Sequence, residues 1–145
     1  MEPRRNREAD INVAKYIKFV IPINPTTKKN STRIVINKRT GKYMVIPSEK
    51  YKDYERQCMA FVPRLGIDYP VNIKAVYYRG TKHRVDLCNL HECLLDVLVK
   101  YGCIADDNSS IVVSMDGSRV LYDKDNPRTE VWIERIEEDG EEKRN

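Results

Sequence analysis

The 145-residue sequence has no long apolar run, no CxxC pair and no glycine-rich phosphate-binding loop. No segment approaches the roughly 20 apolar residues that a membrane-spanning helix requires, so we expect no integral membrane protein. The first 16 residues are basic but lack an apolar core, which argues against a secretory signal. We expect residues 1–15 to form a flexible basic arm. Serine-triad spacings and nucleophilic-cysteine motifs are also absent, which disfavours those enzyme classes.

Cysteine and histidine are scarce, with four and two residues respectively. Without a secretory signal, a disulfide framework is not expected. On a helix, Cys88 and Cys93 would point about 140° apart, which disfavours a zinc site with His83 or His91. We expect His91, at the edge of the apolar arc of that helix, to be structural. The prediction is therefore that all four thiols are buried and reduced, namely Cys58, Cys88, Cys93 and Cys103.

The net charge of +4 conceals a division between the two parts of the chain. Residues 1–85 carry 19 basic and 7 acidic side chains, a balance of +12. Residues 86–145 carry 7 basic and 15 acidic side chains, a balance of −8. Such a division fits a polyanion-binding surface beside a carboxylate cluster, and it also fits a solvated surface with uneven charge.

Hydrophobic periodicity predicts one α+β domain over residues 16–136. A strand at 16–23 precedes a hairpin at 33–46, whose turn falls within 37–41. A helix capped by Ser48 follows, with an apolar stripe that includes Phe61. The remaining expected elements are a strand at 71–79, a helix at 87–101, and strands at 109–115 and 129–136. We expect the two helices to pack on a mixed, largely antiparallel sheet, and the charged tail at 137–145 to be disordered.

Carboxylates flank the second predicted helix. Asp86 stands at its start, and Asp106 and Asp107 follow the helix stop at Gly102. Carboxylate oxygens are the ligands that a hard cation such as Mg²⁺ prefers. Asp86 and Asp107 can meet only if the chain folds back after the helix. Each also has a simpler reading, Asp86 as an N-cap and the doublet as a turn.

Two further acidic residues, Glu92 and Asp96, lie four positions apart on the polar side of this helix. Like charges at this spacing are mildly destabilising unless a cation or a basic side chain sits between them. A solvated face is the ordinary interpretation, and the spacing leans towards function for Glu92. Several basic side chains are candidates for phosphate contacts that give affinity without sequence reading: Lys28, Lys29, Arg33, Lys38, Arg39, Lys82 and Arg84.

The segment RVDLCNLHECLLDVL…ADDNSSIV resembles the central motif of the RusA family of Holliday junction resolvases. The family pattern is a basic residue, then Asp-Leu-Asp-Asn-Leu, a helix with an internal Asp, and Asp-Asp before a strand. The early IPINPTTKKNS is similar to the family's loop after the first strand. The resemblance spans roughly residues 16–136, and its matching positions are Arg84, Asp86, Leu87, Asn89, Leu90, Asp96, Asp106 and Asp107.

Two positions depart from the family pattern. The second Asp of the motif is Cys88 in this chain, and the Lys on the next turn is Glu92. Read literally, the chain lacks one metal-binding carboxylate and one catalytic cation. Either the site has lapsed, or Glu92 supplies the displaced carboxylate. We favour the second interpretation.

The resemblance implies a homodimeric, structure-selective DNA endonuclease of phage or prophage type that resolves four-way junctions in recombination and repair. It implies Mg²⁺, or Mn²⁺ in its place, held by Asp86, Asp107 and Glu92, with Asp106 completing the catalytic carboxylates. The metal would activate water and stabilise charge at the phosphodiester. The expected partner is branched double-stranded DNA, without membrane or small-molecule cofactor, in the cytoplasm of a bacterial host. The alternatives are a catalytically lapsed junction-binding protein and an α+β interaction domain.

Overall fold

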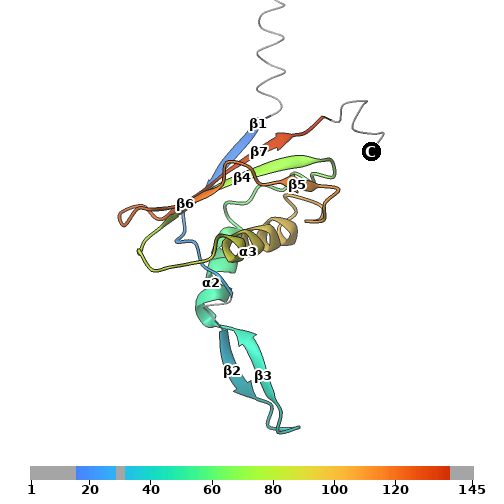
Figure 1. Ribbon diagram of the computed structural model, residues 1–145. Coiled ribbons are helices and arrows are strands. Elements are labelled where there is room, and N and C mark those ends of the chain that lie inside the picture. The colour runs from blue at the N-terminus through green and yellow to red at the C-terminus, as the bar shows by residue number, and fades with distance from the viewer. Residues whose placement is uncertain (1–15, 29–31, 138–145) are drawn as a thin grey trace, which may run out of the picture.

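The computed structural model describes residues 16–28 and 32–137, so the predicted arm and nearly all of the predicted tail lie outside it (Figure 1). Nine elements follow one another along the described chain: β1 (Tyr16–Ile21), β2 (Thr32–Ile36), β3 (Tyr43–Pro47), α2 (Glu49–Cys58), β4 (Val71–Arg79), α3 (Leu87–Lys100), β5 (Val112–Ser114), β6 (Arg119–Tyr122) and β7 (Arg128–Arg135).

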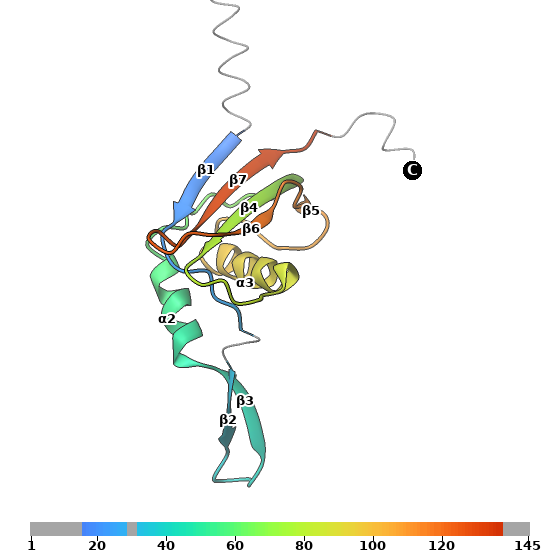
Figure 2. The ribbon, with the colours of Figure 1, turned by 60° about the vertical axis from the view of Figure 1, so that its left-hand side comes forward.

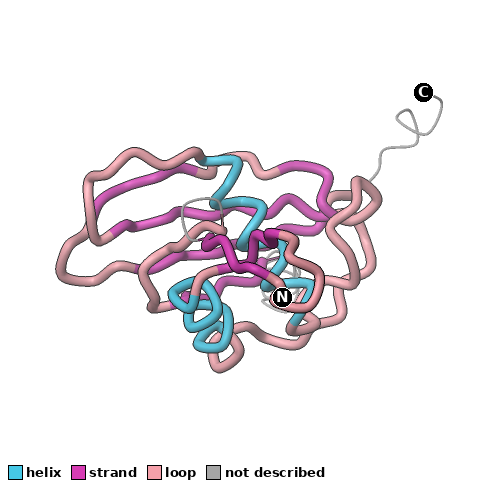
Figure 3. Tube along the Cα trace, turned by 90° about the horizontal axis from the view of Figure 1, so that it is seen from below, coloured by secondary structure: helices cyan, strands magenta, loops and turns pink. Residues whose placement is uncertain are grey.

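The main sheet is mixed. Strands β1, β7 and β4 lie side by side and run antiparallel to their neighbours. The other edge of β4 pairs in parallel with β5 near its start and with β6 near its end. Figure 3 shows the strands of this sheet from below. Over residues 16–28 and 32–137, two helices and a largely antiparallel mixed sheet confirm the predicted α+β class.

One face of the main sheet forms the core, and both helices lie on the same side of it (Figures 1 and 2). Strand β4 alternates as expected from its pattern, with Val71, Ile73, Ala75 and Tyr77 buried on the inner face. The inner residues of β7 lie beside them, as Ala75 pairs with Val131 in the register. Helix α3 adds its apolar stripe to this core, with Leu90, Leu94, Val97 and Leu98 all buried.

Helix α2 begins as predicted, because the Ser48 side chain accepts a hydrogen bond from the Tyr51 amide at 3.4 Å. It ends earlier than expected, at Cys58, and Phe61 is exposed rather than part of the stripe. The residue before a proline is disfavoured in helical conformation, so Pro63 prevents Val62 from extending the helix. The chain turns there instead, burying Val62 and leaving Phe61 in solvent.

Three of the cysteines, Cys58, Cys93 and Cys103, are buried free thiols, and Cys88 is exposed. The prediction that all four are buried was therefore wrong for Cys88. This residue lies in the first turn of α3, at the end of the helix where the neighbouring Leu87 is exposed as well.

The edge beside β4 differs from the sequence-based expectation. Of the predicted 109–115 strand, the structure forms only β5, Val112–Ser114, beside β4. The residues before it form a turn, in which the backbone oxygen of Asn108 accepts hydrogen bonds from the amides of Ile111 and Val112. Strand β6 was not predicted. It pairs with a strand more than 40 positions earlier in the chain, from Val76↔Arg119 to Arg79↔Tyr122, and local periodicity does not record such a pairing.

The hairpin of β2 and β3 forms a separate two-stranded sheet. Figures 1 and 2 both show it projecting away from the main sheet, at the far end of α2. Its turn lies where the sequence places it: Gly41 donates to the Asn37 oxygen and has a positive φ of 70°, a conformation open to glycine.

Candidate active site

Helix α3 separates the two groups of predicted carboxylates. It runs without interruption from Leu87 to Lys100, a rise of about 21 Å for 14 residues. Asp86 is the N-cap, whereas Asp106 and Asp107 follow the other end. Gly102, at φ 78°, ends the helix with the Cys103 amide bonded to the Leu98 oxygen, the pattern of a Schellman cap.

After this cap the chain does not return along the helix. The amide of Ala105 donates to the Ile67 oxygen at 2.8 Å, and Ile67 leads into the start of β4. The end of β4 leads instead towards Asp86. The two carboxylate groups of one chain therefore lie at opposite ends of α3, and the fold-back that would let them meet does not occur.

Asp86 occupies the N-cap position, but its carboxylate does not cap the helix. Among the described residues it accepts a single, long hydrogen bond, from the Asn89 side-chain amide at 3.3 Å. The side chain is exposed. Capping therefore does not account for an aspartate at this position, and its carboxylate is available for another ligand.

Asp106 and Asp107 have different roles. The carboxylate of Asp106 accepts the Asp107 amide at 2.7 Å and the Asn108 side chain at 3.0 Å, so it holds the turn. The hydrogen bond from the Asp107 amide lowers the pKa of Asp106 from its ordinary value. Asp107 is exposed and forms no ion pair with any residue in the described ranges. Of the doublet, Asp107 is the carboxylate that the fold does not require.

Glu92 is exposed on α3, six residues and therefore about 9 Å along the helix axis from Asp86. Asp96, one turn further, pairs with Lys28, whose Nζ lies 2.8 Å from Oδ2. The hydrogen bond to Asp96 raises the pKa of Lys28. The like charges of Glu92 and Asp96 were expected to need a basic side chain nearby. That side chain is Lys28, and it pairs with Asp96.

These positions do not make a metal site within one chain. Among residues 16–28 and 32–137, no three His, Cys, Asp or Glu side chains converge closely enough to hold an ion. Asp86, Glu92 and Asp107 have the oxygen chemistry that Mg²⁺ requires, but α3 holds Asp86 and Asp107 apart. A single chain therefore does not fit a cation bound by all of the predicted carboxylates.

The predicted phosphate contacts within the described residues fall in three places: the hairpin tip, the loop before α3 and the loop after β1. Lys38 and Arg39 are exposed at the tip of the β2–β3 hairpin, and Lys82 and Arg84 are exposed on the loop before α3. Lys28 is tied to α3 through Asp96, and its amide also donates to the Cys93 sulfur at 3.2 Å. Lys29 and the side chain of Arg33 lie outside the described part of the chain.

The loop before α3 is held by Asn24 and Arg79, two residues that the sequence analysis did not single out. The Gly80 amide donates to Asn24 Oδ1 at 2.9 Å, and Arg79 Nη1 donates to the His83 oxygen at 2.6 Å. Arg79 Nε is buried without a partner among the described residues, and burial lowers the pKa of this guanidinium. Two features of the sequence could have pointed to these residues: the Asn24-Pro25 turn, and the basic residue directly before Gly80 at the end of β4.

Tyr77 and His91 connect the sheet to α3. The Tyr77 hydroxyl lies 2.7 Å from His91 Nδ1, and the two rings are tilted against each other at 5.5 Å. Burial lowers the pKa of His91. This contact agrees with the structural role expected for His91.

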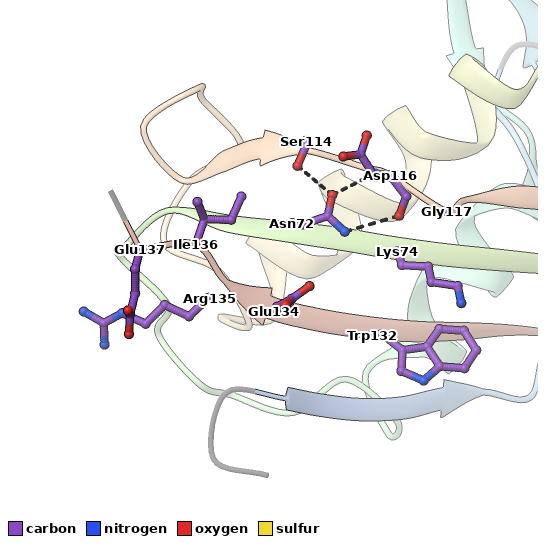
Figure 4. A pocket seen from close by; sticks show the side chains of 10 residues that line it. All are labelled: Asn72, Lys74, Ser114, Asp116, Gly117, Trp132, Glu134, Arg135, Ile136 and Glu137. Atoms are coloured by element: carbon purple, nitrogen blue, oxygen red, sulfur yellow. Dashed lines mark hydrogen bonds between the residues drawn. The ribbon is translucent and has the colours of Figure 1, made fainter. Parts of the chain in front are cut away.

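The outer face of the sheet contains a hollow of about 570 Å³, which none of the predicted carboxylates lines (Figure 4). Asn72 organises one side of it: its Oδ1 accepts Ser114 Oγ at 2.6 Å and the Asp116 amide at 2.7 Å. Trp132 lies at the other side, with Lys74 Nζ 4.6 Å and Lys18 Nζ 4.9 Å from its ring centre. The Asn72 bonds explain Asp116 as part of the turn between β5 and β6.

No helix within the described residues is long and apolar enough to cross a membrane. What the fold presents instead is a small α+β domain with exposed carboxylates at both ends of one helix and basic loops beside it, as expected of a protein that acts on a polyanion.

Comparison with known proteins identifies the class more closely. Residues 22–134 match the family model of endodeoxyribonuclease RusA. The match covers most of the chain, which therefore belongs to the RusA family of endodeoxyribonucleases, and the resemblance noted from the sequence is confirmed. Membership of this family implies nuclease activity of the Holliday junction resolvase type. No curated protein matches the chain.

Proposed function

We propose that this protein is a homodimeric, Mg²⁺-dependent endonuclease that resolves four-way DNA junctions during recombination and repair, in the cytoplasm of a bacterial host and encoded by a phage or prophage. The family match over residues 22–134 supports the junction-cutting activity. The observation that carries the site is the pair of exposed carboxylates, Asp86 and Asp107, that the fold does not use for capping or ion pairing.

The length of α3 makes the dimer part of the proposal. Within one chain the whole of α3, a rise of about 21 Å, lies between Asp86 and the turn that carries Asp107, too far for one cation with oxygen ligands at about 2.0–2.1 Å. In a two-fold dimer with the helices antiparallel, the Asp86 end of one chain lies beside the Asp107 end of the other. Each dimer then holds two equivalent carboxylate groups, and a four-way junction offers two equivalent strands.

Glu92 would supply the carboxylate that Cys88 lacks. Cys88 is exposed in the first turn of α3, and Glu92 follows it by four residues, so both lie near one line along the helix. Asp106 would act by fixing the turn that presents Asp107, since two hydrogen bonds already hold its carboxylate. The exposed loops carrying Lys38, Arg39, Lys82 and Arg84 would hold the DNA arms by their phosphates.

Cleavage of a synthetic four-way junction tests this function. We expect paired incisions that require Mg²⁺, with Mn²⁺ as an alternative, and that stop on chelation. Asp107→Asn should lower the cleavage rate at least about 100-fold while junction affinity and thermal stability stay near wild type, because the carboxylate is exposed and forms no ion pair with the described residues. Asp125→Asn, another exposed aspartate, is the matched control and should cut normally.

The exposed Cys88 in place of an acidic residue supports one alternative, a junction-binding protein with a lapsed site. That alternative predicts tight, salt-sensitive junction binding with no cleavage at any divalent concentration. Equal cleavage by wild type and Asp107→Asn would instead overturn the site assignment. Full activity in Glu92→Gln would remove the role given to Glu92.

A further inference from the structure

One face of the β2–β3 hairpin is apolar and uncovered. In the register, Ile34 lies opposite Val45 and Ile36 opposite Tyr43, and residues directly opposite in an antiparallel pair point to the same face. Their exposed fractions are 71% for Ile34, 69% for Val45, 53% for Ile36 and 73% for Tyr43. We call these four side chains the hairpin face.

Nothing in the described part of the same chain covers the hairpin face. The hairpin is a sheet of its own, and Figures 1 and 2 show it extending away from the main sheet beyond α2. The reverse side of the hairpin is less exposed: Val35 and Ile46 are half-buried, and Met44, opposite Val35, is 45% exposed. An isolated two-stranded hairpin is marginally stable in water, and contiguous exposed apolar patches of this kind mark interaction sites.

We propose that the hairpin face docks on a second copy of this chain, packing against the same face of its hairpin about a two-fold axis. This inference deepens the proposed function and rests on its dimer, since it names the surface that joins the two chains. A face that binds its own copy must be self-complementary, and four uncharged apolar side chains in two cross-strand pairs satisfy that condition. Two such ribbons stacked face to face bury both as a small β-sandwich.

The size of the face fits this occupant. Each of the four side chains offers on the order of 100 Å² of apolar surface, so two copies would bury roughly 800 Å² through these residues alone. Flanking contacts would bring the total towards the roughly 1,200 Å² at which specific interfaces begin.

The chemistry of the face favours protein over DNA. Phosphate contacts need cations or polar donors, and on this hairpin the exposed cations Lys38, Arg39 and Lys42 are at the tip, beyond the hairpin face. The tip is thus left free for a phosphate backbone while the face is covered. The basic tip of the hairpin and its apolar face would then contact different partners, DNA and a second chain.

Sedimentation equilibrium of the full chain tests the proposal. The variant Ile34→Thr/Ile36→Thr/Val45→Thr removes apolar surface but keeps β-branched residues, so strand propensity is preserved. Wild type should be a dimer at micromolar concentration, and the triple variant should weaken dimerisation about a hundredfold or more. The control Met59→Thr/Val113→Thr removes exposed apolar side chains elsewhere and should remain a dimer. Trp132 fluorescence reports whether the main sheet of each variant is folded, and Tyr43→Thr is a milder second variant.

A monomeric wild type at 100 µM, or a triple variant that dimerises as wild type does, would overturn the proposal. A triple variant that stays dimeric but loses junction affinity would overturn it in favour of nucleic acid on the same face. A monomeric triple variant that binds junctions without cutting them would support both the interface and the resolvase dimer. If wild type dimerises through the hairpin but never cuts DNA, the interface stands and the proposed activity fails.

Discussion

The contact between Tyr77 and His91 shows how single residues attach α3 to the sheet. Tyr77 is buried on the inner face of β4, and its hydroxyl meets His91 Nδ1 at 2.7 Å. Burial disfavours the charged form of His91 and lowers its pKa below the ordinary value near 6.5. Folding therefore favours the neutral ring of His91.

This lowered pKa predicts a pH dependence of stability. The unfolded chain binds a proton at His91 at higher pH than the folded chain does, so the contribution is complete above about pH 6.5 and is lost as the pH falls below it. Urea unfolding at a series of pH values between 8 and 5 should show this loss in wild type. His91→Asn, which keeps a polar atom near the Nδ1 position, should flatten the profile.

His83→Asn is the matched control, because His83 is exposed and its removal should leave the profile unchanged. A profile that is as steep in His91→Asn as in wild type would show that another group is responsible.

At the scale of elements, the loop after β1 and helix α3 are joined by Lys28. Its ammonium group pairs with Asp96 and lies 5.3 Å from the Tyr51 ring centre of α2, so one side chain touches both helices. Both members of the ion pair are more than a third exposed, so solvent screens it and we expect less than about 1 kcal/mol of stability from it. The sequence placed Lys28 among the DNA contacts, whereas the structure gives it a partner within the fold.

The salt dependence of junction binding distinguishes basic residues that contact DNA from those that pair within the fold. Replacing both Lys38 and Arg39 by Gln should lower the slope of log affinity against log salt by up to about two, since each neutralised phosphate contributes about 0.9. Lys28→Gln should change this slope little, because Asp96 already neutralises the charge. Fluorescence anisotropy at several salt concentrations measures both. Identical slopes for wild type and the variant with Gln at Lys38 and Arg39 would exclude the hairpin tip from DNA binding.

At the scale of the whole molecule, the proposed site requires two chains, and mixed dimers can show it. A chain with Asp86→Asn keeps Asp107, and a chain with Asp107→Asn keeps Asp86. In a dimer of one of each, one shared site has both carboxylates and the other has neither. After subunit exchange at equal amounts, we expect about a quarter of the wild-type nicking of junction strands, although each variant alone is inactive.

Mixing Asp86→Asn with a chain that carries both substitutions is the control, and it should recover nothing. Absence of recovery in the first mixture, with exchange verified by mass, would mean that the carboxylates of one chain act without the partner's.

The elements with strong local periodicity could be predicted from the sequence. Strand β4 alternates and α3 has an apolar stripe, and both follow from side chains a few positions apart. Strand β6 could not be predicted, since its pairing partner β4 lies far away in the chain. The exposure of Cys88 and Phe61 could not be predicted either. Both lie at the end of a helix, and whether a helix end is covered depends on how the helix packs on the sheet. The family motif was readable because it consists of short spacings around Asp86 and Asp107.

The sequence by itself determined that a helix follows Asp86, that Gly102 ends it and that a carboxylate doublet comes next, because apolar periodicity and the glycine helix stop act over single turns. It also determined the amphipathic pattern that directs α3 to the core. Tertiary structure decided the rest. The rigid rise of α3 and the attachment of Ala105 to Ile67 place the carboxylates at opposite ends of one chain. The detachment of the β2–β3 hairpin from the main sheet leaves its apolar face uncovered by the described part of the chain.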